Sequence, residues 1–310
     1  MEPEWRIINL SKLDTIRLVP SLRNLEIQCA DSGELDRQAV ETVIMGQAAR
    51  LGVVGVTLWT SPTMGSCWPL LLFPNVEGAA VKGKHVVSFE QLLELPKLRH
   101  LCLALPRRTD IALLSGLPIA NLGMLFSSKG QEEVVGRCMS LTVLDAAKWQ
   151  SSNLASLSGL KLKRVVFRRG SLESVHGLEG TLEHAMFMGC LHLRSFEGLN
   201  CRAIDIDACP HIDYESLGRA VGLRRLHLRS QHAIMDFAFI SYCKDLEELT
   251  VNGCTVKADD FSAIERSNSL RDVFIPRLRP RVLEGISRKN PRLKITNGNI
   301  TFFGGQAIAE

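Results

Sequence analysis

The sequence lacks the features that usually reveal an active site or a membrane anchor. Its 310 residues contain no Gly-rich phosphate loop, no His-Glu-x-x-His motif and no Gly-x-Ser-x-Gly motif. Apolar runs such as Leu70–Phe73 are far too short to cross a bilayer. The sequence therefore predicts a protein with no catalytic residues, no cofactor and no membrane partner.

Paired cysteines and excess charge are also missing. Nine cysteines at scattered spacings are an odd number, which fits a reducing compartment better than a disulfide framework. A net charge of +4 gives no sign of the basic stripe that nucleic-acid binders carry. The N-terminal segment Met1–Trp5 lacks the basic and apolar regions of a signal peptide. We therefore expect a cytoplasmic protein for which nucleic acid is an unfavoured partner.

What the sequence does have is a spacing, Leu-x-x-Leu-x-Leu, that returns about a dozen times. Twelve steps from residue 22 to residue 290 cover 268 residues, a mean of about 22. A fixed period of this length is typical of solenoids, in which each repeat packs on its neighbours. The first apolar position of each copy is Leu22, Leu51, Val76, Leu98, Ile119, Leu141, Leu162, Leu182, Cys201, Leu223, Leu246 and Leu270, with a degenerate last copy starting at Asn290.

With this spacing the chain resembles the leucine-rich repeat family over nearly its whole length. Copies such as Leu246–Val251 and Leu223–Leu228 carry the resemblance most clearly. It implies an α/β solenoid with a concave parallel β-sheet and convex short helices or irregular turns. Segment 171–178 is similar to internalin-like repeats and segment 254–264 to cysteine-containing ones. We expect convex helices mainly after residue 210.

The repeat marks also divide the chain. Residues 1–21 are expected to form an N-terminal cap, 22–296 an array of about 12–13 repeats in one elongated unit, and 297–310 a C-terminal cap or tail. Residues 34–50 have the apolar period of a helix. The first two steps are long, and residues 59–75, with their prolines and glycine, are expected to form an inserted loop.

Three cysteines have a structural interpretation. Cys190, Cys209 and Cys254 each fall eight residues after the first apolar position of their repeat. The resemblance implies that a side chain there meets backbone groups of the turn. The alternative is a zinc site formed by Cys190, Cys201, Cys209 and His211, but no closely spaced Cys-x-x-Cys pair supports it. We therefore predict no metal.

Cys243-Lys-Asp245 is similar to the Cys-x-Asp nucleophile of bacterial ubiquitin ligases that carry leucine-rich repeats. Those enzymes hold it in a separate helical domain, whereas Cys243 directly precedes a repeat. A nucleophilic thiol also needs a base or a positive field to lower its pKa, and Lys244 alone is weak support. The interpretation of this motif is structural.

Candidate binding residues come from the outward positions of the predicted strands, because strand side chains alternate between faces. In the first half these positions hold mainly small or apolar residues. In the second half the sign of the charge changes from strand to strand, with exposed methionines between. The predicted partner-binding residues are Arg164, Arg168, His184, Met186, Met188, Asp205, Asp207, Arg225, His227, Arg229 and Glu248.

Two interpretations of this strip are compatible. Neighbouring strands could pair their charges, Asp205 with Arg225 and Asp207 with Arg229, each pair contributing roughly 0.2–1 kcal/mol. The strip could also recognise a protein, because Arg and Met are enriched at interfaces. A second candidate patch is Trp59, Trp68 and Phe73 in the expected loop.

Taken together, the sequence predicts a non-catalytic, protein-binding scaffold. What the resemblance implies more narrowly is one of two uses. The first is an immunity protein, an antitoxin that binds and neutralises a cognate protein toxin in the cytoplasm. The alternative is a substrate-recognition adaptor or effector acting on host proteins. The sequence leaves the oligomeric state open.

Overall fold

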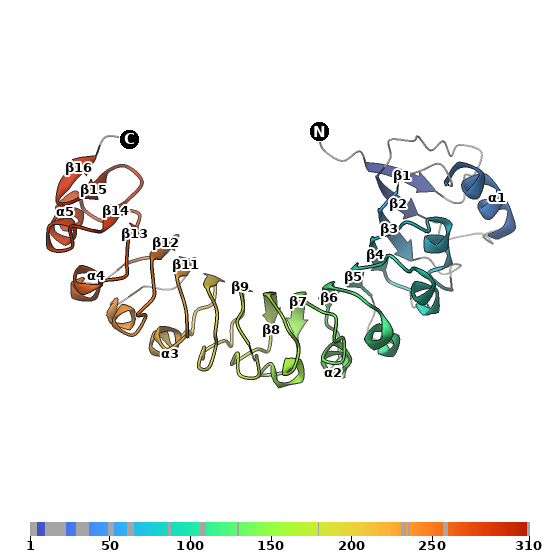
Figure 1. The fold of residues 1–310 in the computed structure, drawn as a ribbon, viewed down its shortest axis with the longest axis horizontal. Helices are drawn as coiled ribbons and strands as arrows, with labels where there is room; N and C mark the ends of the chain where they lie inside the picture. The colour runs from blue at the N-terminus through green and yellow to red at the C-terminus, as the bar shows by residue number, and fades with distance from the viewer. Residues whose placement is uncertain are drawn as a thin grey trace. The chain divides into compact units, whose positions relative to one another are not determined.

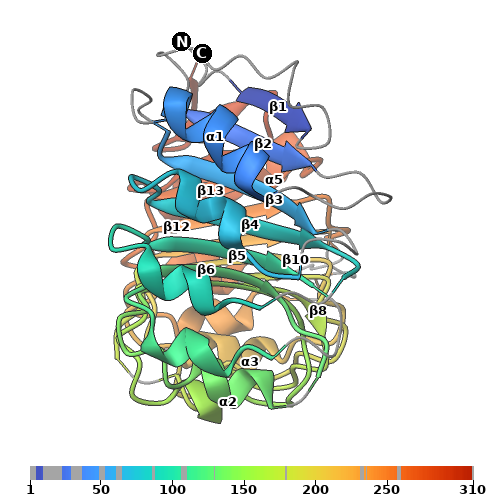
Figure 2. The ribbon, with the colours of Figure 1, turned by 90° about the vertical axis from the view of Figure 1, so that its right-hand side faces the viewer.

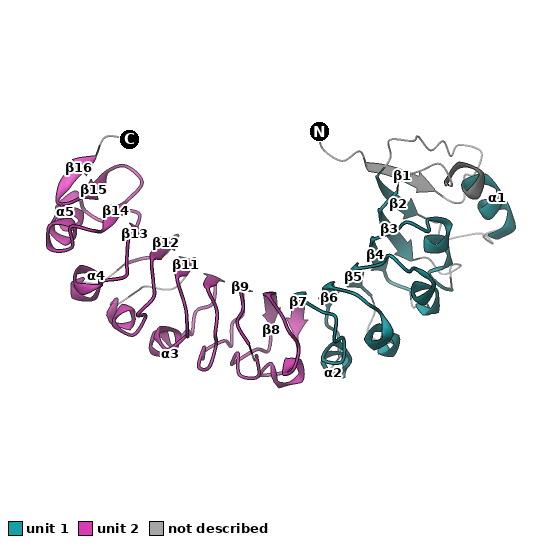
Figure 3. Ribbon diagram, in the orientation of Figure 1, with its two compact units in different colours: residues 1–144 teal, residues 145–310 magenta. Residues whose placement is uncertain are grey.

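A computed structural model gives the fold of the protein (Figure 1). It describes residues 5–9, 23–28, 37–48, 53–60, 65–85, 88–105, 110–128, 130–178, 180–230, 234, 236–256 and 260–308, with the side chains of 5, 6, 8, 9 and 45–48 left out. The chain forms two compact units, residues 1–144 (unit 1) and 145–310 (unit 2), which Figure 3 shows in different colours. Each unit is described by itself.

Unit 1 is a stack of strands that each pair in parallel with the next (Figure 2). The strands are β1 (Trp5–Asn9), β2 (Asn24–Gln28), β3 (Gly55–Thr60), β4 (Gly78–Gly83), β5 (His100–Ala104) and β6 (Asn121–Leu125). The segments between them hold α1 (Arg37–Ala48), the 3₁₀ helices η2 (Trp68–Leu72), η3 (Glu90–Glu94) and η4 (Ala112–Gly116), and then α2 (Gln131–Val135).

Unit 2 repeats this arrangement. Strand β7 (Val143–Trp149) begins in the last two residues of unit 1 and continues into unit 2. The next strands are β8 (Arg164–Gly170), β9 (His184–Met188), β10 (Ala203–Asp207), β11 (Arg225–Arg229), β12 (Glu248–Asn252), β13 (Asp272–Phe274) and β14 (Lys294–Thr296), with parallel pairing from β8 to β14. The other segments hold η5 (Ala155–Leu157), α3 (Tyr214–Gly218), η6 (Ala238–Ser241), α4 (Ser262–Arg266) and α5 (Pro280–Lys289).

The sheet of unit 2 ends in an antiparallel hairpin. Strands β15 (Thr301–Phe303) and β16 (Gln306–Ile308) follow β14 and pair antiparallel with their neighbours. Thr301 and Phe302 are buried. The hairpin therefore covers the last parallel strand.

The alternation of side chains explains why one face of each sheet is the core. In β12, Leu249 and Val251 are buried, whereas Glu248, Thr250 and Asn252 point outward. Buried leucines of the return segments close the other side of the core, so that neighbouring repeats bury one another's apolar faces. We call the outward side of the strands the strand face; in unit 2 it lies opposite α3, α4 and α5 (Figure 1).

Aromatic rings strengthen the core of unit 2. Phe167 in β8 stacks on Phe187 in β9 with ring centroids 5.9 Å apart. Trp149 meets Phe167 edge-on at 5.5 Å, and Phe196 meets Phe187 in the same way at 5.3 Å. Edge-to-face and offset pairs at these distances stabilise a core beyond the area that they bury.

Most of the architecture expected from the sequence is confirmed. Each unit has its parallel sheet on one face and short helices or turns on the other, as expected for the predicted solenoid. The helix expected over residues 34–50 is α1, and its apolar side includes the buried Val40 and Ile44. The expectation of convex helices mainly after residue 210 is wrong, because α1, α2 and the 3₁₀ helices η2–η5 precede that residue, whereas α3, η6, α4 and α5 follow it.

The structural interpretation of the cysteines is confirmed as well. The thiols of Cys190, Cys209 and Cys254 donate to the carbonyls of Phe167, Phe187 and Leu228, at 3.6, 3.6 and 3.7 Å. Each carbonyl belongs to the strand of the preceding repeat. The cysteines therefore tie each turn to the repeat before it.

Asp272 pairs with Lys294, so the last repeat begins at Arg292 and not at Asn290 as expected. Two expectations for the N-terminal repeats are wrong as well. Asn24 pairs with Gly55, so the second repeat begins at Val53 and not at Leu51. Residues 59–75 are also not a simple inserted loop, because Trp59 lies in β3 and 68–72 form η2; residues 61–64 lie outside the described part of the chain. Within the described residues, no helix is long and apolar enough to span a membrane.

Candidate protein-binding face

The predicted binding residues all lie on the strand face of unit 2. They occupy outward positions of five successive strands, and the register brings them into adjacent rows. The strands and their residues are β8 with Arg164 and Arg168, β9 with His184, Met186 and Met188, β10 with Asp205 and Asp207, β11 with Arg225, His227 and Arg229, and β12 with Glu248.

The centre of this face is a carboxylate held between two histidines. Asp205 Oδ2 lies 2.8 Å from His184 Nε2 on β9, with which it shares a hydrogen bond. Its Oδ1 lies 2.8 Å from His227 Nδ1 on β11, a close contact without hydrogen-bond alignment. We call His184, Asp205 and His227 the histidine row.

The histidine row has a clear electrostatic consequence. Burial raises the pKa of Asp205, but the contacts with His227 and His184 outweigh burial and bring that pKa down to about 2. Asp205 therefore stays ionised throughout the neutral and mildly acidic range. A hydrogen bond to a charged carboxylate is stronger than one between neutral groups, so Asp205 fixes the orientation of the His184 ring, and its charge also attracts the His227 ring at 2.8 Å.

A second contact orders the neighbouring strands. Arg168 Nη2 on β8 lies 2.9 Å from Asp145 Oδ2 on β7. Burial raises the pKa of Asp145, and the charges of Arg168 and Arg164 oppose that rise. Both side chains are partly exposed to solvent, so this pair contributes little to stability but restricts the Arg168 side chain.

One predicted ion pair is wrong. Asp205 lies opposite His227, and Arg225 lies opposite Ala203 on one side and Glu248 on the other. Asp207 does lie opposite Arg229, as predicted. The correct partner of Asp205 follows from position within the repeat, because residues 205 and 227 both stand four places after the first apolar position.

Sequence reasoning missed several residues of the same face. These are Asp145 on β7, and Asp272, Phe274 and Lys294 on β13 and β14. The last three, with Glu248 and Thr250, line a shallow pocket of about 180 Å³. The repeat marks already placed all four at outward positions, so the same spacing rule would have found them.

The strand face of unit 1 has a different character. The predicted register places mainly small or apolar residues at the outward positions there, and these are Asn24, Glu26, Gln28, Val53, Gly55, Thr57, Gly78, Ala80, Lys82, His100, Cys102 and Ala104. Val53 is buried, with 2% of its surface exposed, because the repeat begins there. Trp59 takes the third outward position of β3, where the indole N–H donates to Glu26 Oε1 at 3.0 Å.

The second candidate patch is therefore wrong. Trp68 and Phe73 are only 7% and 2% exposed, whereas Trp59 is 41% exposed on the strand face. The Lys82 ammonium lies 5.8 Å from the centre of the Trp59 ring, within the range of a cation–π contact. Among the described side chains, Trp59 is thus an oriented aromatic residue on the strand face that forms no patch with Trp68 and Phe73.

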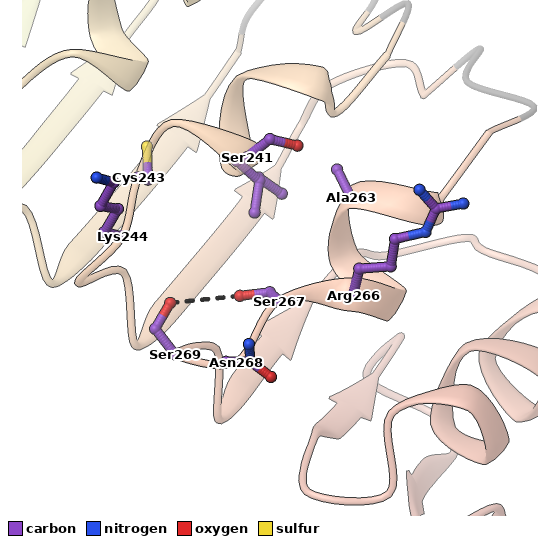
Figure 4. Close-up of a pocket in the computed structure, with 9 residues that line it drawn as sticks. Ser241, Cys243, Lys244, Ala263, Arg266, Ser267, Asn268 and Ser269 are labelled. Atoms are coloured by element: carbon purple, nitrogen blue, oxygen red, sulfur yellow. Dashed lines mark hydrogen bonds between the residues drawn. The ribbon is translucent and has the colours of Figure 1, made fainter.

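Cys243 has the environment of a core residue. Burial raises the pKa of its thiol to about 12, the opposite of what a nucleophile requires. Cys243, Lys244 and Arg266 line a pocket of about 380 Å³ among the return segments of unit 2. Figure 4 shows Cys243 and Lys244 on one side of it and Arg266 on the opposite side. The hydroxyls of Ser267 and Ser269 bond to each other at 3.3 Å. The polar groups around this pocket do not converge on one point.

The zinc alternative also finds no support in the geometry. The Cys201 thiol donates to the carbonyl of Ala203 at 3.0 Å, and Cys190 and Cys209 bond to carbonyls of two other strands. His211 is exposed. Among the described residues, no group of three or more His, Cys, Asp or Glu side chains is placed to hold a metal ion.

Among the comparisons with known proteins, only those with solved structures give matches. No family model and no curated protein matches the chain. Similar solved structures include an internalin from Listeria monocytogenes, with 12% identity, coverage of 89% of this chain and 80% of that one, and a TM-score of 0.43. A leucine-rich repeat protein from Leptospira interrogans has 14% identity, coverage of 92% and 76%, and a TM-score of 0.38. The Toll–Spätzle complex of Drosophila has 11% identity, coverage of 94% and 54%, and a TM-score of 0.39.

Proposed function

We propose that this protein is a non-catalytic scaffold that binds another protein through the strand face of unit 2. The observation that carries the proposal is the histidine row, with Asp205 held at 2.8 Å by a histidine on each side. Side chains fixed in this way lose little entropy when a partner docks, and preorganisation of this kind favours affinity.

The side chains around the row suit protein recognition. Arg164, Arg168, Arg225 and Arg229 are exposed, and Met186 and Met188 are half-buried between them. Arginine and methionine are enriched at the centres of protein interfaces, where a few residues supply most of the binding energy. No described thiol supports a catalytic alternative of the Cys-x-Asp kind, since Cys243 is buried.

Within this class we propose one fixed partner rather than many. An adaptor with several targets would benefit from a surface that can repack, whereas the histidine row and the Arg168–Asp145 pair hold this surface in place. An immunity protein that neutralises a cognate toxin in the cytoplasm is the more specific form of this proposal. The scattered free cysteines are consistent with a reducing compartment.

The test is capture of the tagged protein from its native lysate, followed by mass spectrometry and sizing of the eluted complex. We expect one stoichiometric partner, toxic when expressed alone if the immunity form is correct. The double variant Arg225→Glu/Arg229→Glu should release it while circular dichroism shows an intact fold. Partner binding that is unchanged in this variant would refute the strand face of unit 2 as the contact surface. A heterogeneous set of partners would favour the adaptor.

A further inference from the structure

The charges on the strand face of unit 2 are layered by depth. Between β7 and β12, the four carboxylates at outward positions, Asp145, Asp205, Asp207 and Glu248, are all half-buried. The four arginines at outward positions of the same strands, Arg164, Arg168, Arg225 and Arg229, are all exposed. A partner that approaches this face therefore meets the guanidinium groups first.

The numbers of arginines and carboxylates also show that the two histidines determine the net charge of this face. With His184 and His227 neutral, the four arginines and four carboxylates cancel, and the outward positions of β7–β12 carry no net charge. Protonation of both rings leaves a net charge of +2. Histidine is the side chain that ordinarily makes this change between about pH 5 and pH 8.

The groups that face each histidine can be named. His184 on β9 has Arg164 opposite it on β8 and Asp205 diagonally across on β10. His227 on β11 has Asp205 opposite it on β10 and Thr250 opposite it on β12. Along their own and adjacent strands stand Arg168, Asp207, Arg225, Arg229 and Glu248.

Protonation also changes what the rings can bind. Asp205 stays ionised, so in each neutral ring it favours the proton on the nitrogen that faces it, and the other nitrogen is left as an acceptor. A protonated ring donates from both nitrogens. A carboxylate can only accept hydrogen bonds, so it can bond to the second nitrogen of these rings only when they are protonated.

Charge and hydrogen bonding thus change together. We infer that the strand face of unit 2 recognises an acidic segment of its partner and binds it more tightly as the histidine row is protonated. Arg164 on β8 lies opposite His184, and Arg225 lies two residues before His227 on β11; among the described residues neither arginine forms an ion pair. They supply the part of the attraction that does not depend on pH. This inference rests on the proposed function, because it names the chemistry of the partner at the same face.

The experiment uses the full chain and a fluorescein-labelled peptide of alternating Glu and Ser, with a Lys-Ser peptide as the control for charge. Fluorescence anisotropy is measured between pH 7.5 and pH 5.5 at constant ionic strength. Two added charges at a solvent-accessible face should tighten binding of the acidic peptide about tenfold across this range. The basic peptide should show no such gain.

Three variants make the result specific. His184→Gln/His227→Gln keeps hydrogen-bonding side chains but cannot titrate, so the pH dependence should disappear. His192→Gln/His211→Gln makes the same change at two exposed histidines in the turns that follow β9 and β10. Binding to this variant should keep its pH dependence. Arg164→Gln/Arg225→Gln should weaken binding at every pH. Circular dichroism checks each fold, and the single variant His227→Gln, expected to halve the effect on a logarithmic scale, replaces the double variant if that one unfolds.

The outcomes separate the two proposals. A captured partner that is released by Arg225→Glu/Arg229→Glu, but an acidic peptide that fails to bind at pH 5.5, would leave the proposed function standing and overturn this inference. Binding that tightens as the pH rises, or a pH dependence that survives His184→Gln/His227→Gln, would overturn it too. Loss of both partner capture and peptide binding in all tests would refute the binding face itself.

Discussion

Units 1 and 2 share one repeat geometry but differ in what their strand faces carry. At the middle outward position, unit 1 has Ile7 and Glu26 and then residues no larger than cysteine or threonine, whereas unit 2 has Asp145, Met186, Asp205 and His227 beside the smaller Val166 and Thr250. The residues at this position are Ile7, Glu26, Thr57, Ala80, Cys102 and Gly123 in unit 1, and Asp145, Val166, Met186, Asp205, His227 and Thr250 in unit 2.

The difference shows which positions of a repeat are free to change. The inward positions are apolar and buried in both units, for example Leu101 and Leu103 in β5 and Leu226 and Leu228 in β11. A repeat that loses them cannot bury its face against its neighbours. The outward positions carry no such requirement, so they are where two stacks of the same architecture can acquire different functions.

The cores differ as well, and the largest expected effect tests that difference. Phe187→Ala removes a fully buried ring that contacts Phe167 and Phe196. We expect the free energy of unfolding to fall by about 3–5 kcal/mol. Leu103→Ala, in a core position of unit 1 without these ring pairs, should cost about 2–5 kcal/mol. Urea denaturation followed by circular dichroism measures both, and a smaller loss for Phe187→Ala than for Leu103→Ala would contradict the role of the ring stack.

A smaller effect is expected at a glycine of unit 2 where an added Cβ would meet backbone atoms. Gly170 has φ +99°, and a Cβ there would lie 2.3 Å from the carbonyl oxygen of Trp149. Gly180 has a similar φ of +87°, but no atom lies within 4 Å of its Cβ position. Gly180→Ala should therefore cost about 1–2 kcal/mol from backbone conformation alone. Gly170→Ala should cost about 1–3 kcal/mol more, because the clash is added. Equal losses of stability would show that the clash relaxes freely.

The histidine row should contribute to stability as well as to binding. The pKa of Asp205 is about 2 in the folded chain, below its ordinary value of 3.8, so its contribution is present above about pH 4 and lost as the pH falls through 2. At pH 7 we expect Asp205→Asn to lower the free energy of unfolding by roughly 2 kcal/mol. Below pH 2 the variant and the natural protein should have similar stability.

Denaturation at several pH values measures this difference, and Asp207→Asn, two residues along the same strand, is the matched control. A stability difference for Asp205→Asn that does not shrink between pH 4 and pH 2 would show that the two histidines do not stabilise the ionised carboxylate. If Asp207→Asn lowers the free energy of unfolding as much as Asp205→Asn does, the stabilisation does not come from the contacts with the two histidines.

The sequence predicted which residues of this face point outward, but it gave the wrong partner for Asp205. Period-2 alternation fixed the inward residues, such as Leu249 and Val251, and with them the outward ones. A shift of two residues preserves that alternation, and 51–56 holds several apolar residues, so Leu51 and Val53 fit the template equally well. For Asp205, opposite charges suggested Arg225, but parallel strands align equal positions of successive repeats, and that alignment gives His227.

The smallest expected effect tests whether the two strand faces really have separate roles. Trp59 is the one large exposed aromatic side chain among the described outward positions of unit 1, and Glu26 and Lys82 orient it. An oriented, exposed tryptophan is also a residue type that dominates interfaces.

If only unit 2 binds the partner, Trp59→Ala should change its affinity less than twofold and lower stability by about 1 kcal/mol or less, because it removes one exposed hydrogen bond and one exposed cation–π contact. Titration of the captured partner against Trp59→Ala and Arg225→Glu in parallel measures the contrast. A loss of affinity with Trp59→Ala as large as with Arg225→Glu would place the contact on unit 1 as well, and the small outward residues of unit 1 would then be space for the partner rather than the absence of a site.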